Sequence, residues 1–124
     1  MTVLATIALL ASTLIHLLPT LGVLGASRLE SLYGISADDP TVRLLLQHRA
    51  VLFGIVAAVC LTGALWSPLR LTALVVAVVS TWSYVALWRA VGARSAPIDR
   101  VAYIDFALGV LLAVALVGVL ATKM

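Results

Sequence analysis

Four long runs of apolar residues, each followed by a short polar segment, dominate the pattern of the chain. The runs cover residues 3–24, 44–66, 71–91 and 101–121. As a helix rising 1.5 Å per residue, the first run would reach about 33 Å, enough to cross a hydrocarbon core of about 30 Å. The pattern therefore predicts an all-α membrane protein: a four-transmembrane-helix bundle with up-down-up-down order, in a single domain.

Proline marks the start of three of these helices. The dipeptides are Asp39-Pro40, Ser67-Pro68 and Ala96-Pro97. Proline suits the first helical turn, where its missing N–H costs no hydrogen bond, and Asp39 and Ser67 are good N-cap residues. The predicted spans are about 3–25, 41–66, 69–91 and 98–121, and a long loop covers 26–39.

Composition supports a lipid environment. Hydrophobic residues make up 64% of the chain and charged residues 10%, against roughly 45–50% and about 25% in soluble domains. The net charge of +3 comes from basic residues scattered over loop ends. Since they form no basic stripe and no aromatic stacking platform, we expect no nucleic-acid partner.

The distribution of basic residues predicts an orientation. The side that holds the 26–39 and 92–97 segments carries Arg28, Arg43, Arg49, Arg89, Arg94 and Arg100, and the other side carries Arg70 and Lys123. Loops rich in Lys and Arg stay in the cytoplasm. We therefore expect a cytoplasmic (inner) membrane protein with both termini outside and the two arginine-rich connections inside.

Polar side chains within the spans form the candidate site. Charged groups at membrane depth are costly and usually face a bundle interior or a wet cavity. Gln47-His48-Arg49 and Asp105 each lie about two turns into a helix that starts on the cytoplasmic side. The candidate catalytic residues are His48, Arg49, Asp105 and Tyr103. The candidate ligand-binding residues are His16, Gln47, Ser83, Tyr84 and Arg89.

Several roles fit these residues. A His–Asp–Tyr set suits acid–base chemistry, such as isomerisation or epoxide opening. Arg49 and Asp105 could instead form a structural ion pair between helices, or Arg49 could snorkel to headgroups. His48 and His16 could be hydrogen-bonded packing residues, with interhelical bonding favoured for His16, or either could bind haem. We expect Ser80, Thr81 and Ser83 to bond to their own helix.

Known nucleotide and metal motifs are missing from the sequence. It has no Walker-type phosphate loop and no HExxH or CxxC motif, and two histidines with the single Cys60 make a closed zinc site unexpected. We interpret Cys60 as a small apolar packing residue.

One stretch of sequence resembles a known family. The segments are 15–19 (IHLLP), 22–25, 28–30, 32–34 and 47–54 (QHRAVLFG, of which HRAVLFG is the most distinctive part), together with an Asp in a late span. Together they resemble a family of small bacterial four-span membrane proteins of unassigned function, some of whose members carry the label phosphopantetheine adenylyltransferase. The chain lacks the phosphate-binding motif of such soluble enzymes. The resemblance implies the four-span architecture and importance for His48, Arg49 and Asp105.

Two functions follow from the sequence. The first is a polar pocket in the inner leaflet that binds, and transforms by acid–base chemistry, a lipophilic small molecule drawn from the membrane lipid. The alternative is a non-catalytic accessory or scaffold subunit of a membrane complex. Self-association as a homo-oligomer is compatible with both.

Overall fold

The computed structural model describes residues 1–122 and consists of helices joined by short connections. Its elements are α1 (Thr2–Thr20), the 3₁₀ turn Leu21–Leu24, α2 (Ala26–Tyr33), α3 (Pro40–Leu65), the 3₁₀ turn Ser67–Leu69, α4 (Arg70–Val91) and α5 (Ala96–Ala121). The part of the chain that the structure describes contains no strand. The predicted all-α four-helix bundle is confirmed.

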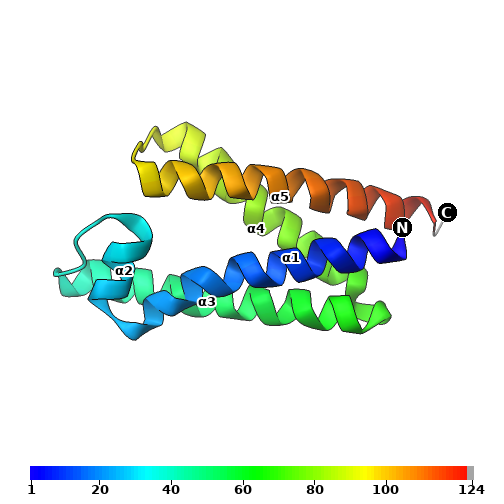
Figure 1. Ribbon diagram of the computed structural model, residues 1–124, viewed down its shortest axis with the longest axis horizontal. Helices are drawn as coiled ribbons and strands as arrows, with labels where there is room; N and C mark the ends of the chain where they lie inside the picture. Colours follow the sequence, from blue (N-terminus) through cyan, green and yellow to red (C-terminus); the bar gives the residue numbers. More distant parts are fainter. Residues whose placement is uncertain (123–124) are drawn as a thin grey trace.

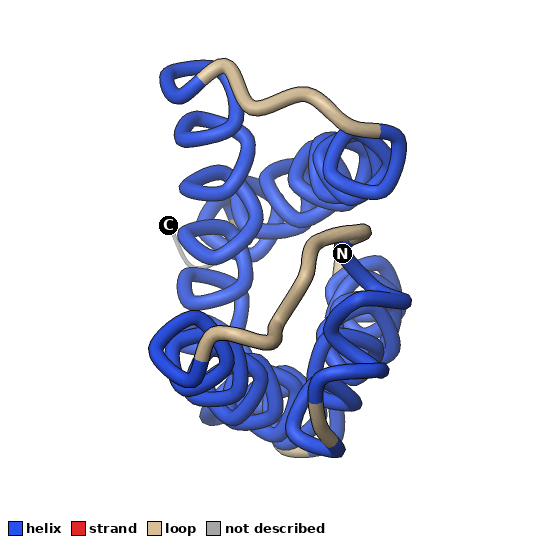
Figure 2. Tube along the Cα trace, turned by 90° about the vertical axis from the view of Figure 1, so that its left-hand side faces the viewer, coloured by secondary structure: helices blue, strands red, loops and turns tan. Residues whose placement is uncertain are grey.

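The four long helices alternate in direction along the bundle (Figure 1). One end, called the α2 end below, holds α2 and the connections 34–39 and 92–95. The opposite end, called the termini end, holds the start of α1, the turn at 66–69 and the last turn of α5. α1 packs mainly against α3, and α4 mainly against α5. Figure 2 looks onto the α2 end, where loops run between the helices.

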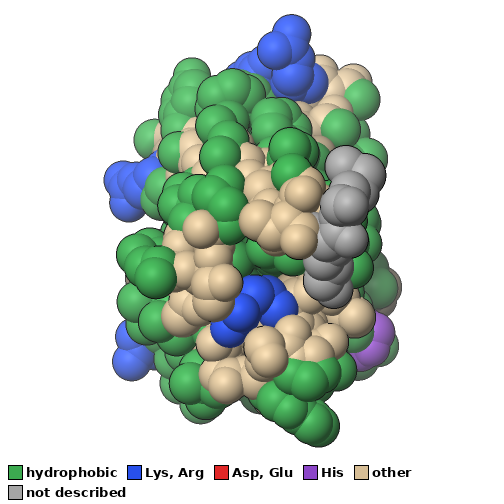
Figure 3. All heavy atoms as spheres, turned by 90° about the vertical axis from the view of Figure 1, so that its right-hand side faces the viewer, with side chains coloured by type: hydrophobic (Ala, Val, Ile, Leu, Met, Phe, Trp, Pro, Cys, Tyr) green, Lys and Arg blue, Asp and Glu red, His purple; other side chains and the backbone are tan. Residues whose placement is uncertain are grey.

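All four long helices are long and apolar enough to cross a membrane. The segments are Thr2–Leu24, Pro40–Leu65, Ser67–Val91 and Ala96–Ala121, with mean hydropathy from 1.8 to 2.6. Large apolar side chains such as Leu14, Leu44 and Val117 lie exposed on the outside of the bundle, as lipid contact requires. The chain is a multi-pass membrane protein. Hydrophobic side chains also cover much of the termini end (Figure 3).

Small residues let the helices approach closely. The bundle core contains fully buried Ala5, Ala8, Ala73, Ala77 and Ala115, with Leu9, Leu74 and Leu112 filling the space between them. Lipid provides no hydrophobic drive for helix association, so close backbone packing has to supply the attraction. One close approach is between α3 and α4, where a Cβ placed on Gly63 would overlap the Cβ of Ala73.

The segment expected as a loop contains the amphipathic helix α2. Leu29 and Tyr33 are buried and pack with Ala37, whereas polar residues of α2 face outwards. Gly25 (φ 130°) precedes the helix and Gly34 (φ 66°) ends it in the left-handed region that favours glycine. A helix of two turns has too short a hydrophobic period to stand out in the sequence. Because a helix this short is not stable alone, packing against the bundle stabilises α2.

One predicted helix cap is confirmed and the other is wrong. The Asp39 carboxylate accepts hydrogen bonds from the N–H groups of Thr41 and Val42 at 2.7 and 3.3 Å, as an N-cap should. Ser67 makes no side-chain cap bond in the described chain, because it opens a 3₁₀ turn and α4 begins only at Arg70. The tight turn between α3 and α4 takes the place of a cap.

The Gly63 contact gives a stability prediction. Gly63→Ala should lower the free energy of unfolding by about 1–3 kcal/mol, the usual cost of overpacking, because the new methyl group would meet Ala73 and lie 3.3 Å from the Leu69 carbonyl oxygen. Denaturant unfolding in detergent micelles would measure this. Thr62→Ala, at the exposed neighbouring position, is the control and should change stability by less than about 0.5 kcal/mol. Equal stability of the two variants would contradict the packing argument.

Candidate functional site

A cavity of about 420 Å³ opens near the α2 end, between α1, α2, α3 and α5. Its volume lies within the roughly 300–1,000 Å³ range typical of small-molecule sites. The apolar lining residues are Ile15, Leu18, Pro19, Leu32, Phe53, Pro97, Val101 and Ile104. The polar lining residues are His16, Ser31, Tyr33, Arg49, Arg100 and Asp105. We call this the main cavity.

Arg49 and Asp105 lie at the same level in the bundle. Arg49 precedes the end of α3 at Leu65 by sixteen residues, and Asp105 precedes the end of α5 at Ala121 by sixteen. Each is therefore about 24 Å along its helix from the termini end. A hydrocarbon core about 30 Å thick that begins at the termini end extends past both residues. The same measure puts Arg100 about 32 Å along α5, at the level of the headgroups.

Arg49 is held by aromatic rings. Its guanidinium carbon lies 5.1, 4.9 and 5.4 Å from the ring centroids of Tyr33, Phe53 and Tyr84. These rings, which we call the aromatic cage, come from α2, α3 and α4. Cation–π contacts contribute about 0.5–2 kcal/mol each, with the larger values where water is excluded. The cage therefore joins three helices through one cation.

Asp105 is buried without a protein partner. Its residue is only 6% exposed, and it lines the main cavity from α5. Among residues 1–122, no group donates a hydrogen bond to its carboxyl group and no cation lies within 4.0 Å. The Arg49–Asp105 ion pair considered from the sequence is therefore not formed. Because the aromatic cage holds the guanidinium, the two groups face the same cavity without touching.

His16 is a structural crosslink between α1 and α4. Its Nδ1 lies 2.8 Å from the Ser12 carbonyl oxygen and its Nε2 lies 2.9 Å from the Ser80 hydroxyl oxygen. Both bonds are satisfied when Nδ1–H donates to the carbonyl and the Ser80 hydroxyl donates to Nε2. The interhelical bond predicted for His16 is confirmed. Haem ligation through His16 would require breaking the bond to Ser80.

Two of the four candidate catalytic residues lie outside the main cavity. His48 is exposed, and Tyr103 is 67% exposed with its ring packed edge-on against Trp88 at 5.8 Å. Successive helical residues are 100° apart, so His48 cannot share a face with Arg49, nor Tyr103 with Asp105. The structure therefore brings Arg49 and Asp105 to one cavity and leaves His48 and Tyr103 on the outer surface.

The candidate binding residues divide in a similar way. Gln47 Nε2 donates to the Val23 carbonyl oxygen at 3.1 Å, and Tyr84 contributes to the aromatic cage. Ser83 is exposed and its hydroxyl donates to the Ser80 carbonyl oxygen of its own helix, as expected. Arg89 is exposed. Only His16 of this set lines the main cavity.

Several cavity residues had no place among the sequence candidates. Phe53 lies four residues after Arg49 on α3, so helical spacing alone could have assigned it to the same face. Tyr33 belongs to α2, whose helical character the sequence does not show clearly. Ser31 and Arg100 line the outer part of the cavity, and neither carries a distinctive motif.

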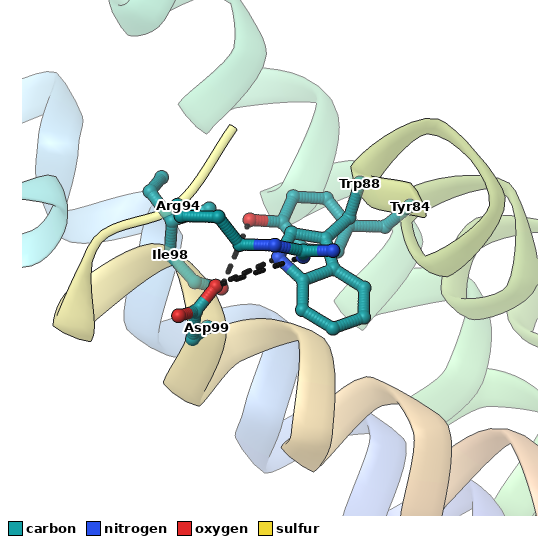
Figure 4. Close-up of polar contacts among 5 residues, drawn as sticks. All are labelled: Tyr84, Trp88, Arg94, Ile98 and Asp99. Atoms are coloured by element: carbon teal, nitrogen blue, oxygen red, sulfur yellow. Dashed lines mark hydrogen bonds and ion pairs between the residues drawn. The ribbon is translucent and has the colours of Figure 1, made fainter. Parts of the chain in front are cut away.

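The start of α5, which forms one cavity wall, is fixed by contacts around Trp88 (Figure 4). Trp88 Nε1 donates to Asp99 Oδ1 at 2.9 Å, and the Arg94 guanidinium carbon lies 4.0 Å from the centroid of the Trp88 ring. The Tyr84 hydroxyl donates to the Ile98 carbonyl oxygen at 3.5 Å. These contacts hold α5 against α4 where the main cavity opens.

The chemistry of the site comes from a few organic groups. Within the described residues, no three His, Cys, Asp or Glu side chains gather in a way that could hold a metal ion. Searches against protein-family models, curated proteins and solved structures found no match to the chain. The main cavity itself presents an apolar surface, a guanidinium edge and a carboxyl group, a combination suited to binding an amphiphilic molecule.

The cavity should alter the acidity of Tyr33. Burial raises the pKa of the Tyr33 phenol above its ordinary value of 10.0, and the positive charge of Arg49 partly opposes that rise. The folded state should thus keep the phenol protonated to higher pH than the unfolded chain does. The stability from docked Tyr33 is present below pH 10 and should be lost as the pH rises through the folded pKa.

Ultraviolet titration near 295 nm would measure this pKa in a protein carrying Tyr84→Phe and Tyr103→Phe. Arg49→Gln in that background should raise the pKa of Tyr33 further, because it removes the nearby cation. Arg28→Gln, an exposed change on the same short helix, is the control. A Tyr33 pKa that falls in the Arg49→Gln protein would show that Arg49 does not act on the phenol.

Proposed function

We propose that the main cavity binds a lipophilic small molecule that enters from the bilayer. The observation that carries this proposal is the burial of Asp105 in a largely apolar cavity without a protein partner. A group of this kind is costly at membrane depth and is usually kept for function. A purely structural carboxylate would be expected to pair with the nearest cation, whereas Arg49 is held in the aromatic cage instead.

The shape of the cavity supports entry from the side. Leu18 on α1 and Ile104 on α5 both line the main cavity and are 58% and 42% exposed. We expect the cavity to reach the lipid-facing surface at these two residues, which we call the α1–α5 opening. A lipophilic molecule could pass through it without leaving the hydrocarbon core.

We place the α2 end in the cytoplasm and both termini outside, in the cytoplasmic membrane. The six arginines counted on the side of the bundle that holds the α2 end support this orientation. Lys123, one of the two basic residues on the other side, lies outside the described residues. The main cavity would then lie in the inner leaflet, and membership of the bacterial four-span family remains a proposal on the sequence resemblance.

Any acid–base transformation of the ligand would depend on Asp105. It is the only carboxyl group among the described residues that line the cavity, and the Tyr33 hydroxyl lines the same cavity from α2. His48 and Tyr103 lie outside the cavity and would take no direct part. Binding is therefore the central proposal, and an isomerase-like reaction is an extension of it.

A role as an accessory or scaffold subunit is the second candidate. The observation that favours it is His48, a polar side chain exposed on a span whose neighbours Leu44, Leu45 and Leu52 are also exposed. A polar group on such a face can hydrogen-bond to a helix of a partner or of a second copy. This role predicts that His48→Ala weakens assembly and leaves the cavity unaffected.

Native mass spectrometry of the protein extracted from membranes tests the binding role. Wild-type protein should retain a bilayer-derived lipophile, and Asp105→Leu should reduce its occupancy at least about tenfold, because the cavity then lacks its acceptor. Thermal stability without ligand should be equal or higher, since an unpaired buried polar group is removed. Tyr103→Phe, exposed on the same helix, is the matched control.

The scaffold role predicts a different outcome from the same proteins. It requires that His48→Ala weakens assembly and that lipophile occupancy is equal in the wild type, Asp105→Leu and Tyr103→Phe. That result would overturn the binding proposal.

A further inference from the structure

We infer that the occupant of the main cavity is a long-chain alcohol: an uncharged lipophile whose head group is a hydroxyl bound between Arg49 and Asp105. This inference rests on the proposed function and names the ligand class of the same cavity. It follows from the hydrogen-bonding capacity and the charges of Arg49 and Asp105, two polar groups that line the cavity.

Arg49 requires an acceptor from the ligand. Its guanidinium lies against the rings of the aromatic cage, at 4.9–5.4 Å from their centroids. The N–H groups at the edge of the guanidinium plane are therefore free to bond to a ligand. A guanidinium has five N–H donors and no acceptor. Within residues 1–122, the Arg49 side chain makes no hydrogen bond to a protein acceptor. A head group at this edge must therefore offer an oxygen or nitrogen lone pair.

Asp105 requires a donor from the ligand. Asp105 is only 6% exposed as a residue, lines the cavity, and its carboxyl group has no donor among the residues that the structure describes. Arg49 and Asp105 are more than 4.0 Å apart, since they do not form one of the ion pairs of the described chain. One hydroxyl can donate to Asp105 and accept from Arg49 at the same time.

The charges of Arg49 and Asp105 oppose both ionic alternatives. An anionic head would pair with Arg49 but lie beside the Asp105 carboxylate, and a cationic head would pair with Asp105 but lie beside the Arg49 guanidinium. Like charges at close range are strongly unfavourable in a medium of low dielectric constant. Arg100 also lines the cavity but is exposed, so water and salt screen its charge more than that of Arg49. A neutral head avoids both repulsions.

The remaining wall fits a single hydrocarbon tail. Ile15, Phe53 and Val101 surround the polar pair with apolar surface, and the α1–α5 opening at Leu18 and Ile104 leads to the lipid. The tail can therefore lie partly in the cavity and partly in the bilayer while the hydroxyl stays inside.

Binding of four probes to the delipidated protein in nanodiscs tests this inference. The probes share one chain and differ in the head: hexadecan-1-ol, its methyl ether, hexadecanoate and hexadecylammonium. Native mass spectrometry and the shift of the melting temperature report binding. The alcohol should bind at least about tenfold more tightly than the ether, which accepts but cannot donate, because a site built for a hydroxyl discriminates strongly against an analogue that leaves its polar group unpaired.

Two variants assign the effect to the named groups. Asp105→Leu should reduce the preference for alcohol over ether to less than about twofold, since the acceptor of the hydroxyl proton is removed. Arg49→Gln should weaken binding of the alcohol and the ether together, because both use their oxygen as the acceptor. Asp99→Asn, outside the cavity, is the control and should leave the preference unchanged. If a cavity variant does not fold, the alcohol–ether comparison on the wild-type protein decides alone.

The outcomes separate this inference from the proposal beneath it. Equal binding of alcohol and ether, or tightest binding of hexadecanoate or hexadecylammonium, would overturn the alcohol assignment and leave a lipophile-binding cavity in place. Failure of all four probes, with no bilayer lipid retained by the protein, would overturn both.

Discussion

The cation–π contacts of Arg49 organise the half of the bundle that lies towards the α2 end. A guanidinium within the hydrocarbon level has to be compensated, and the aromatic cage does this with the faces of Tyr33, Phe53 and Tyr84. Because these rings belong to α2, α3 and α4, their contacts attach a short helix to two spans. They also keep the guanidinium away from Asp105, and this separation creates the polar character of the main cavity.

The rest of the bundle has a different physical basis. Away from the cavity, the helices pack through alanine and glycine, with backbones close enough for van der Waals attraction to hold them. Such an interface has little room for a ligand. The cavity lies near the α2 end, where the larger side chains Pro19, Phe53 and Pro97 are among its lining residues.

Sequence reasoning recovered the features that depend on one helix at a time. The four spans follow from length and hydropathy, the Asp39 cap from local geometry, and the depth shared by Arg49 and Asp105 from counting residues along α3 and α5. The partner of each group depends on which way a helix is rotated in the bundle. Depth alone made His48 and Tyr103 plausible neighbours of Asp105, but tertiary packing turns their faces outwards. The helix α2 is likewise not evident from the sequence, because packing of Leu29 and Tyr33 against the bundle stabilises it.

The two glycines that flank α2 have a consequence for motion. Gly25 and Gly34 adopt positive φ values that other residues rarely accept, and no side chain placed on Gly25 would meet a neighbour within 4 Å. A rigid two-turn helix between two such joints can detach as a unit while the spans stay folded. The backbone amides of α2 should then exchange with solvent deuterium together, at one shared rate faster than that of the spans, and any molecule that bridges Tyr33 and α5 would slow them all at once.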